Sequence, residues 1–177
     1  KYLSETLVTD VKLSKPQLEV AVRCNDTVAS HDNIFLRRVR LKNESDELRE
    51  IRVFFHHDFR INENKVADTA YYDPETGSVI HYQKRRYFLI NTDPPFSSFA
   101  TGRKDFQGQE GTWRDAEDGV LNGGAMTEGS VDSTVGVHVH LDGGAEVEFY
   151  YWIAAGVDHQ EVHRQPLFLL FSRHTRS

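Results

Sequence analysis

Residues 69–83 read TAYYDPETGSVIHYQ, and this stretch decides the fold class. Polar and apolar side chains alternate on both sides of the segment Asp73–Gly77, which is the pattern of two half-buried strands rather than of a helix. Within that segment, Pro74 presets the φ angle of a turn, and Gly77 accepts a positive φ. The stretch therefore predicts two short strands joined by a tight turn.

The same alternation continues in both directions along the chain. Strand patterns occupy residues 6–13, 17–23, 34–43, 48–59, 85–91, 135–141 and 145–155. The turn ESDE predicts an antiparallel hairpin of 34–43 with 48–59, and Asp142-Gly143-Gly144 predicts a second hairpin of 135–141 with 145–155. Short strands in this number predict an all-β fold, an antiparallel β-sandwich.

The stretch between residues 92 and 134 departs from this pattern. It holds seven of the 12 glycines, together with Phe99, Phe106 and Trp113. A glycine-rich segment of this length that carries large aromatic side chains is typical of a functional or interface loop. Its centre, residues 110–119, reads EGTWRDAEDG and surrounds Trp113 with charged residues.

The carboxylates of residues 110–119 allow two interpretations. Asp115 and Glu117 suggest the acid and base of a glycoside hydrolase, but that chemistry needs carboxylates on opposite sides of the substrate, about 5–9.5 Å apart. Two residues that are two positions apart on one strand lie on the same side. The favoured alternative is structural: Asp115 and Asp118 accept backbone N–H groups and set the turn at Gly119. No catalytic residue is expected here.

Two pairs of histidines and two acidic turns are the candidates for metal ligands. His56 and His57 are adjacent and face opposite sides of a strand, whereas His138 and His140 share a face but need a third ligand from elsewhere. The acidic segments 73–77 and 115–119 lack the regular oxygen spacing of a calcium loop. Neither a phosphate-binding loop nor a serine nucleophile motif is present. The sequence therefore predicts no metal site and no cofactor.

Composition limits the partners. Acidic residues outnumber basic ones by 27 to 21, which gives a net charge of -6 and a pI near 5.8. This balance argues against nucleic acid as a partner, since phosphate binding depends on clustered Lys and Arg. No apolar run approaches the roughly 20 residues that cross a bilayer, so no membrane partner is expected. With a single cysteine, Cys24, and no visible signal peptide, the cytoplasm is the default expectation.

The pattern changes again after Gly156. Asp158 and Glu161 predict a capping box at the start of a helix, and Pro166 would interrupt that helix. The apolar run 167–171 predicts a segment that packs on the sandwich or leads to another domain. We therefore expect a sandwich domain at 1–156 and a short helical or linker segment at 157–177.

Long strings of the sequence, read together, resemble a known family. The strings are FFHHDFRI, DTAYYDPETGSVIHY, RRYFLIN, ATGRKDFQGQEGTWRDAEDG, GSVDSTVG and YYWIAAG. In order and spacing, from about Leu7 to Gly156, the chain resembles the N-terminal β-domain of glycoside hydrolase family 15, which includes glucoamylases, glucodextranases and trehalases. The resemblance implies a super-sandwich fold that precedes an (α/α)6 catalytic barrel. It also implies inverting catalysis by two Glu residues of that barrel, so that no position of this chain inherits a catalytic role.

The chain departs from the family pattern in two places. Ala67 stands where a Gly is more usual, and the sequence begins at Lys1, where family members carry further strands. The second departure implies an uncovered sheet edge, at which copies of the chain would pair into a homo-oligomer.

The resemblance favours a non-catalytic domain that braces the family 15 barrel in cis. The candidates for the domain interface or for binding are Phe106, Trp113, Arg114, Asp115 and Asp118. Two alternatives stay open: an α-glucan-binding module that uses Tyr71, Tyr72, Tyr82, Trp113 and Trp152, and a self-sufficient hydrolase that uses Asp115, Glu117 or Asp118. The substrate of the parent enzyme (maltooligosaccharide, dextran or trehalose) is not fixed by these residues.

Overall fold

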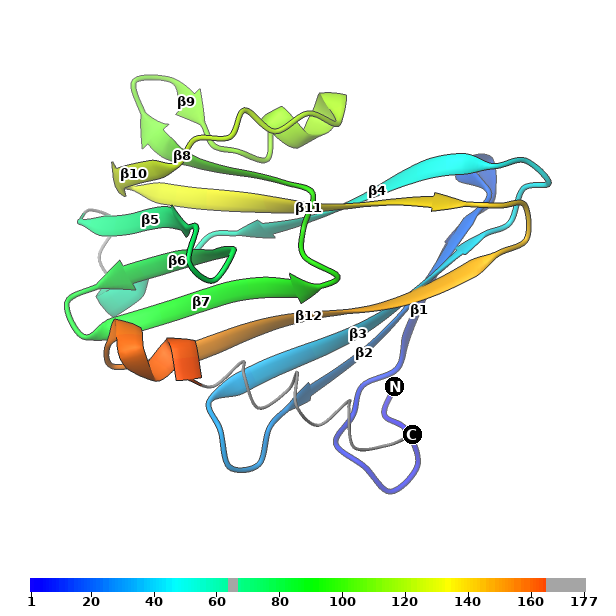
Figure 1. The fold of residues 1–177 in the computed structure, drawn as a ribbon, viewed down its shortest axis with the longest axis horizontal. Coiled ribbons are helices and arrows are strands. Elements are labelled where there is room, and N and C mark those ends of the chain that lie inside the picture. Colours follow the sequence, from blue (N-terminus) through cyan, green and yellow to red (C-terminus); the bar gives the residue numbers. More distant parts are fainter. Residues whose placement is uncertain (64–66, 165–177) are drawn as a thin grey trace.

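A computed structural model describes residues 1–63 and 67–164 and shows two antiparallel sheets packed face to face (Figure 1). The larger sheet has the order β1 (Val11–Lys15), β2 (Val20–Val28), β3 (Ile34–Asn43), β12 (Glu146–Gly156), β7 (Arg86–Asp93), β6 (Ser78–Gln83), β5 (Asp68–Asp73) and β10 (Met126–Gly129). The smaller sheet has the order β4 (Arg49–His57), β11 (Val131–Leu141), β8 (Ser98–Phe106) and β9 (Gln109–Glu110). The prediction of an all-β sandwich is confirmed.

Helical structure is confined to short segments. The 3-10 turns are η1 (Pro16–Leu18), η2 (Ile61–Glu63) and η3 (Asp115–Asp118), and residues 159–164 form a helical turn after β12. Within residues 1–63 and 67–164, none of the helices has the length and apolar character that a bilayer crossing requires. The predicted strands 6–13 and 17–23 are shifted, because Pro16 begins η1 and the two strands run from Val11 and from Val20 instead.

The main core lies between the two sheets. Phe149 of β12 and Val39 of β3 pack against Val137 of β11 from the opposite sheet, and all three side chains are buried. Farther along the sandwich, Tyr151 of β12 stacks on Phe55 of β4 with 4.4 Å between ring centroids. Successive residues of β12 alternate between the two faces of its sheet, so the odd-numbered ones enter this core.

A second apolar cluster lies on the outer face of the larger sheet. Trp152 and Leu89 project there from β12 and β7, and Val162 of the helical turn 159–164 covers them. Figure 1 shows this turn against the ends of β7 and β12. Half of the predicted capping box is present at its start, where the Glu161 N–H donates to Asp158 Oδ1 at 2.9 Å, while the Glu161 carboxylate accepts the N–H of Val157 at 2.8 Å. Because Val162 is fully buried, the turn packs as part of the sandwich.

Both hairpins predicted around residues 44–47 and 142–144 are wrong. β3 pairs with β2 and β12, while β4 pairs with β11, so each of these connections crosses from one sheet to the other. The two crossings contact each other, because the Gly144 N–H donates to the Ser45 carbonyl at 3.0 Å. A Cβ at Gly143 would lie 2.3 Å from the Asp46 backbone, so this close contact requires glycine.

The region 92–134 contains more regular structure than its glycines indicate. β8 pairs with β11 over six residues, and β10 pairs with β5. Only residues 111–125 form an extended connection between strands, and this part contains the segment EGTWRDAEDG. The Gly-rich connection is therefore shorter than the sequence predicts.

Other expectations from the sequence are not settled by the fold. β1 and β4 lie at sheet edges, so pairing of copies at an edge stays a prediction. The predicted domain boundary coincides with the end of β12 at Gly156. Pro166 and the apolar run 167–171 lie outside the described residues.

Candidate functional site

The segment 110–119 covers the outer face of the smaller sheet. It leaves β9, passes through η3 and returns toward β10, and Figure 1 shows it beyond β8 and β11, away from the larger sheet. Two buried hydrogen bonds fasten it at Thr112. The Thr112 N–H donates to Asp132 Oδ2 at 2.8 Å, and the Thr112 hydroxyl lies 2.9 Å from the Thr134 hydroxyl.

Two glycines allow this close attachment. Gly111 has a φ of 106°, and a Cβ there would lie 2.2 Å from Asp132 Oδ2. At the other end, Gly119 has a φ of 81°, and its carbonyl accepts a 2.8 Å hydrogen bond from Arg52 Nη1 of β4. The segment is therefore held at both ends by the smaller sheet.

Asp132 is the centre of this attachment. Its side chain is fully buried, and its Oδ2 atom also lies 2.9 Å from Nε2 of the half-exposed His56 on β4. The neighbouring His57 faces the opposite way, where its Nε2 lies 2.7 Å from the Tyr151 hydroxyl between the sheets. The prediction that these two histidines face opposite sides of one strand is confirmed.

Trp113 and Arg114 form the exposed surface of the segment. Trp113 is 41% exposed, although its Nε1–H donates to the Glu110 carbonyl at 2.7 Å. The Arg114 guanidinium lies 5.0 Å from the Trp113 ring centroid and pairs with the carboxylates of Glu110 and Glu117. Because these ion pairs are about half exposed, solvent weakens each of them, but together they orient the guanidinium beside the indole.

The remaining predicted residues take different positions. Asp118 Oδ1 accepts the Val120 N–H at 2.8 Å, which closes the turn around Gly119 as the structural alternative for the segment predicts. Asp115, Glu117 and Asp118 all lie in η3, a single helical turn. Phe106 is the last residue of β8, and its side chain lies outside the described part of the structure.

The aromatic side chains that would form a sugar platform do not lie together on an open surface. Trp152 is 4% exposed and belongs to the outer-face cluster. Tyr72 stacks on Phe99 at 4.1 Å, and Tyr82 stacks on Tyr87 at 5.0 Å. Of the five aromatic residues considered for glucan binding, Trp113 is the exposed one.

A buried polar network between the sheets was not predicted. The Ser133 hydroxyl of β11 lies 2.7 Å from His81 Nε2 and 3.3 Å from His57 Nδ1. Burial is the main cause that lowers the pKa of both histidines to about 3, and the charges of neighbouring histidines contribute to the shift of His57. Ser133 is fully buried, so this serine–histidine contact stabilises the core and is closed to a substrate.

The predicted histidine pair of β11 makes other contacts. His138 Nε2 lies 3.2 Å from the Ser98 hydroxyl, and its Nδ1 lies 3.7 Å from a Glu50 oxygen. Within residues 1–63 and 67–164, one group of three potential metal ligands lies close enough to share an ion, and it is formed by Asp73, His159 and His163. None of the three was predicted as a ligand, because the sequence does not show that the end of β5 meets the turn 159–164.

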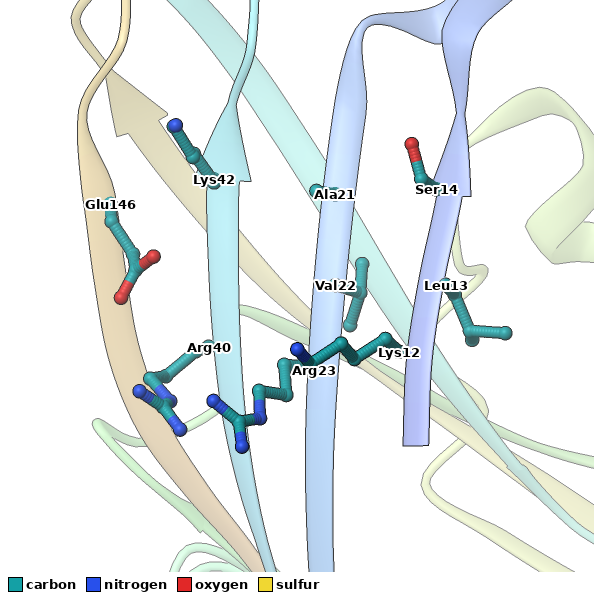
Figure 2. A pocket seen from close by; sticks show the side chains of 9 residues that line it. All are labelled: Lys12, Leu13, Ser14, Ala21, Val22, Arg23, Arg40, Lys42 and Glu146. Atoms are coloured by element: carbon teal, nitrogen blue, oxygen red, sulfur yellow. The ribbon is translucent and has the colours of Figure 1, made fainter. Parts of the chain in front are cut away.

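A basic groove crosses the outer face of β1, β2, β3 and β12. It has a volume of about 330 Å³, and Figure 2 shows Arg23, Arg40 and Lys42 around it with Glu146 at one side. Arg23 is already held by Asp10, with Nε 2.6 Å from Oδ1. The positive charge of the groove is therefore partly neutralised.

This chain is similar to a known protein family and to a longer protein. The family model described as "Glycosyl hydrolase 94, supersandwich domain" matches residues 10–165. An uncharacterized glycosyl hydrolase of Methanocaldococcus jannaschii is 26% identical over 154 residues, which are 86% of this chain and 24% of that protein.

Solved structures agree at the level of the fold. A bacterial glucoamylase complexed with acarbose superposes with a TM-score of 0.77 at 9% identity, over 96% of this chain and 25% of that one. A putative kojibiose phosphorylase from human microbiome gives a TM-score of 0.54 at 11% identity, over 95% and 21% of the two chains. This chain spans about a quarter of the length of each of these relatives.

Proposed function

This chain belongs to the glycosyl hydrolase 94 supersandwich domain family, and from this membership we propose that it is the non-catalytic N-terminal domain of a carbohydrate-cleaving enzyme. The observation that carries the proposal is the match over residues 10–165, together with relatives that are about four times longer. The active site would then lie in a catalytic domain that is joined to this sandwich in cis. The role of the sandwich is to brace that domain.

Residues 110–119 are the surface that we assign to the contact with the catalytic domain. Trp113 and Arg114 offer an aromatic ring and a cation side by side, and both residue types are enriched at the centres of protein interfaces. Anchors at Thr112 and Gly119 fix the segment before any partner binds, so little conformational entropy is lost on docking. Asp115 and Asp118 supply polar contacts at the rim.

The positions of the carboxylates support a non-catalytic role. Asp115, Glu117 and Asp118 share one helical turn, and Glu117 pairs with Arg114. Glycoside hydrolysis requires two carboxylates on opposite sides of the scissile bond, and neighbours on one turn do not provide them.

The family match favours family 94 for the parent enzyme over family 15, which the sequence strings suggested. A glucoamylase-like or trehalase-like partner stays the second candidate, on the strength of those strings. The two candidates differ in a measurable way, since one structural relative is named as a phosphorylase and another as a glucoamylase. Sugar release by the full-length enzyme from maltooligosaccharide, trehalose and kojibiose, with and without inorganic phosphate, separates hydrolysis from phosphorolysis.

The interface is tested in the full-length enzyme with Trp113→Ala. We expect the sandwich to unfold at a lower temperature, with a loss of more than about 1 kcal/mol, and activity to fall because the brace is weakened. Leu48→Ala is the matched control, because Leu48 is also exposed but lies in the crossing between β3 and β4. Equal behaviour of the two variants in calorimetry and in activity would exclude the interface role.

The isolated chain tests the non-catalytic role and the glucan-binding alternative. We expect the folded chain to release no glucose from maltooligosaccharide or trehalose. If the folded chain does release glucose, and Asp115→Asn or Glu117→Gln abolishes that release, the segment is an active site. Quenching of tryptophan fluorescence by maltooligosaccharide in the native chain, together with no quenching in Trp113→Phe, would favour a glucan-binding module.

A further inference from the structure

A cluster of ligand-type side chains lies where the β5–β6 turn meets the helical turn 159–164. Asp73 ends β5, and His159 and His163 come from the helical turn. One carboxylate oxygen and two imidazole nitrogens of these residues all lie within 4.8 Å of one another. We propose that Asp73, His159 and His163 bind a divalent transition-metal ion, which fastens the helical turn to the sandwich.

The helical turn presents its two histidines together. Residues four positions apart lie on one face of a helix, and a His pair at this spacing is a recurrent zinc-binding arrangement. The rings of His159 and His163 lie 3.9 Å apart between centroids. Val162, fully buried in the outer-face cluster, fixes the rotation of the turn, so the pair faces β5 without a metal ion to hold it there.

The carboxylate is held in place by its own turn. Asp73 Oδ2 accepts the Thr76 hydroxyl at 2.6 Å, and Oδ1 accepts the Glu75 N–H at 3.2 Å. Metal-binding carboxylates are commonly oriented by outer hydrogen bonds of this kind. Asp73 is therefore positioned as a ligand by residues that do not themselves reach the ion.

A second observation points to an ion at this place. His163 Nε2 is buried and has no hydrogen-bond partner within the described chain, although it lies 3.0 Å from Asp73 Oδ2. Two ligands of a tetrahedral ion, at bond lengths of about 2.0–2.1 Å, are separated by roughly 3.3 Å. The spacing of the two atoms thus matches that of neighbouring ligands, and a metal ion would satisfy the buried nitrogen.

The donor set selects the type of ion. Two imidazoles with one carboxylate suit Zn²⁺, Co²⁺, Ni²⁺ or Cu²⁺, whereas Ca²⁺ and Mg²⁺ prefer sites built from oxygen alone. Beside the cluster lies a pocket of about 370 Å³ that His163 lines together with Thr76 and Asn91. Water from this pocket would supply the remaining coordination position.

The experiment is a titration of the chelator-treated protein with Zn²⁺ by calorimetry, and with Co²⁺ by visible absorption. We expect one equivalent of Zn²⁺ to bind, and Co²⁺ to give the intense bands of a site with fewer than six ligands. Loss of an outer partner weakens metal sites by about 10–100-fold, so loss of a ligand itself, in His159→Ala or His163→Ala, should weaken binding by more than about 100-fold. Thr76→Val should weaken it less.

The controls separate this site from other histidines and from an ion pair. His140→Ala removes an exposed histidine of β11 and should leave binding unchanged. His159→Ala spares the direct contact between His163 and Asp73, so it tests the site even if Asp73→Asn or His163→Ala disturbs folding. Failure of the native protein to bind Zn²⁺, or equal affinity in His159→Ala and His140→Ala, would overturn the proposal and leave a His163–Asp73 ion pair.

Discussion

At the scale of single residues, the position of the 110–119 segment depends on Asp132. Its buried carboxylate accepts the Thr112 N–H and contacts His56, and it leaves no room for a side chain at Gly111. One aspartate on β11 thereby determines where Trp113 and Arg114 emerge. A buried acceptor that loses its donor costs about 1–3 kcal/mol, so this contact is a point at which the segment can be released.

Gly111→Ala should release the segment, whereas Gly108→Ala should not. Both glycines have a positive φ, so both variants carry a backbone cost of about 1 kcal/mol. Only at Gly111 does the new Cβ meet Asp132, and we expect a further loss of about 1–3 kcal/mol because the buried hydrogen bond breaks. Urea unfolding and hydrogen exchange at the Thr112 amide measure the two effects. Equal losses in the two variants would show that Asp132 does not hold the segment.

At the scale of the elements, the two crossings between the sheets are joined by Asn43, the last residue of β3. Its fully buried amide group donates to the carbonyls of Glu47, Leu141 and Asp142, and its Oδ1 atom accepts hydrogen bonds from Ser45 and Arg49. The crossings are more than 90 residues apart in the chain. One side chain therefore holds the same end of both sheets.

Asn43→Ala should destabilise the protein by about 2–4 kcal/mol, because it leaves the buried carbonyl of Leu141 and the partly buried carbonyls of Glu47 and Asp142 without their donor. Asn33→Ala, at an exposed asparagine just before β3, is the control and should change stability by less than about 0.5 kcal/mol. Chemical denaturation gives both values. A loss below about 1 kcal/mol for Asn43→Ala would show that the crossings hold together through their backbone contacts alone.

At this scale the sequence predicts strands and turns but not which strands pair. Alternation identifies 34–43 as a strand with the observed bounds, and Asp73–Gly77 as a true hairpin turn, because both are local properties. The partner of a strand is a non-local property. A short Asp-Gly-Gly turn is compatible with a hairpin and equally with a crossing between sheets, so the pairing of β12 with β3 and β7 could not be predicted.

For the candidate site too, the character of single residues could be predicted from the sequence, whereas the contacts between distant residues could not. The mixed aromatic and charged character of Trp113 and Arg114 is visible in the sequence, and both are exposed in the structure. Their anchor is not visible, because Thr112 and Asp132 are 20 positions apart and meet only through the packing of the segment on β11. Asp73 and His163 are likewise brought together only by the packing of the turn 159–164.

At the scale of the whole molecule, stability should fall as the pH drops from 7 to 5. His57 and His81 have pKa values near 3 when folded, against an ordinary value of 6.5, because burial excludes their charged forms. Below pH 6.5 the unfolded chain therefore binds protons that the folded chain does not. Each histidine removes stability with a limiting slope of about 1.4 kcal/mol per pH unit, and the stability is regained above pH 6.5.

Urea unfolding at pH 7, 6 and 5 measures this slope. Variants that remove exposed histidines, His31→Asn and His140→Asn, should keep this slope, because they leave the buried pair His57 and His81 in place. A stability that stays level between pH 7 and pH 5 would mean that the buried pair is protonated without cost, for example through Asp132, whose charge raises the pKa of His81.

The outer-face cluster under Val162 has a consequence for how such a domain is inherited. The last strand ends at Gly156, yet Trp152 and Leu89 are covered by a residue that comes after it. A recombination event that exchanged the sheets alone would expose that surface, while one that carried eight more codons, to residue 164, would preserve it. The unit that can be inherited intact is thus longer than the unit that the strands define, and the family match ends at almost the same place, at residue 165.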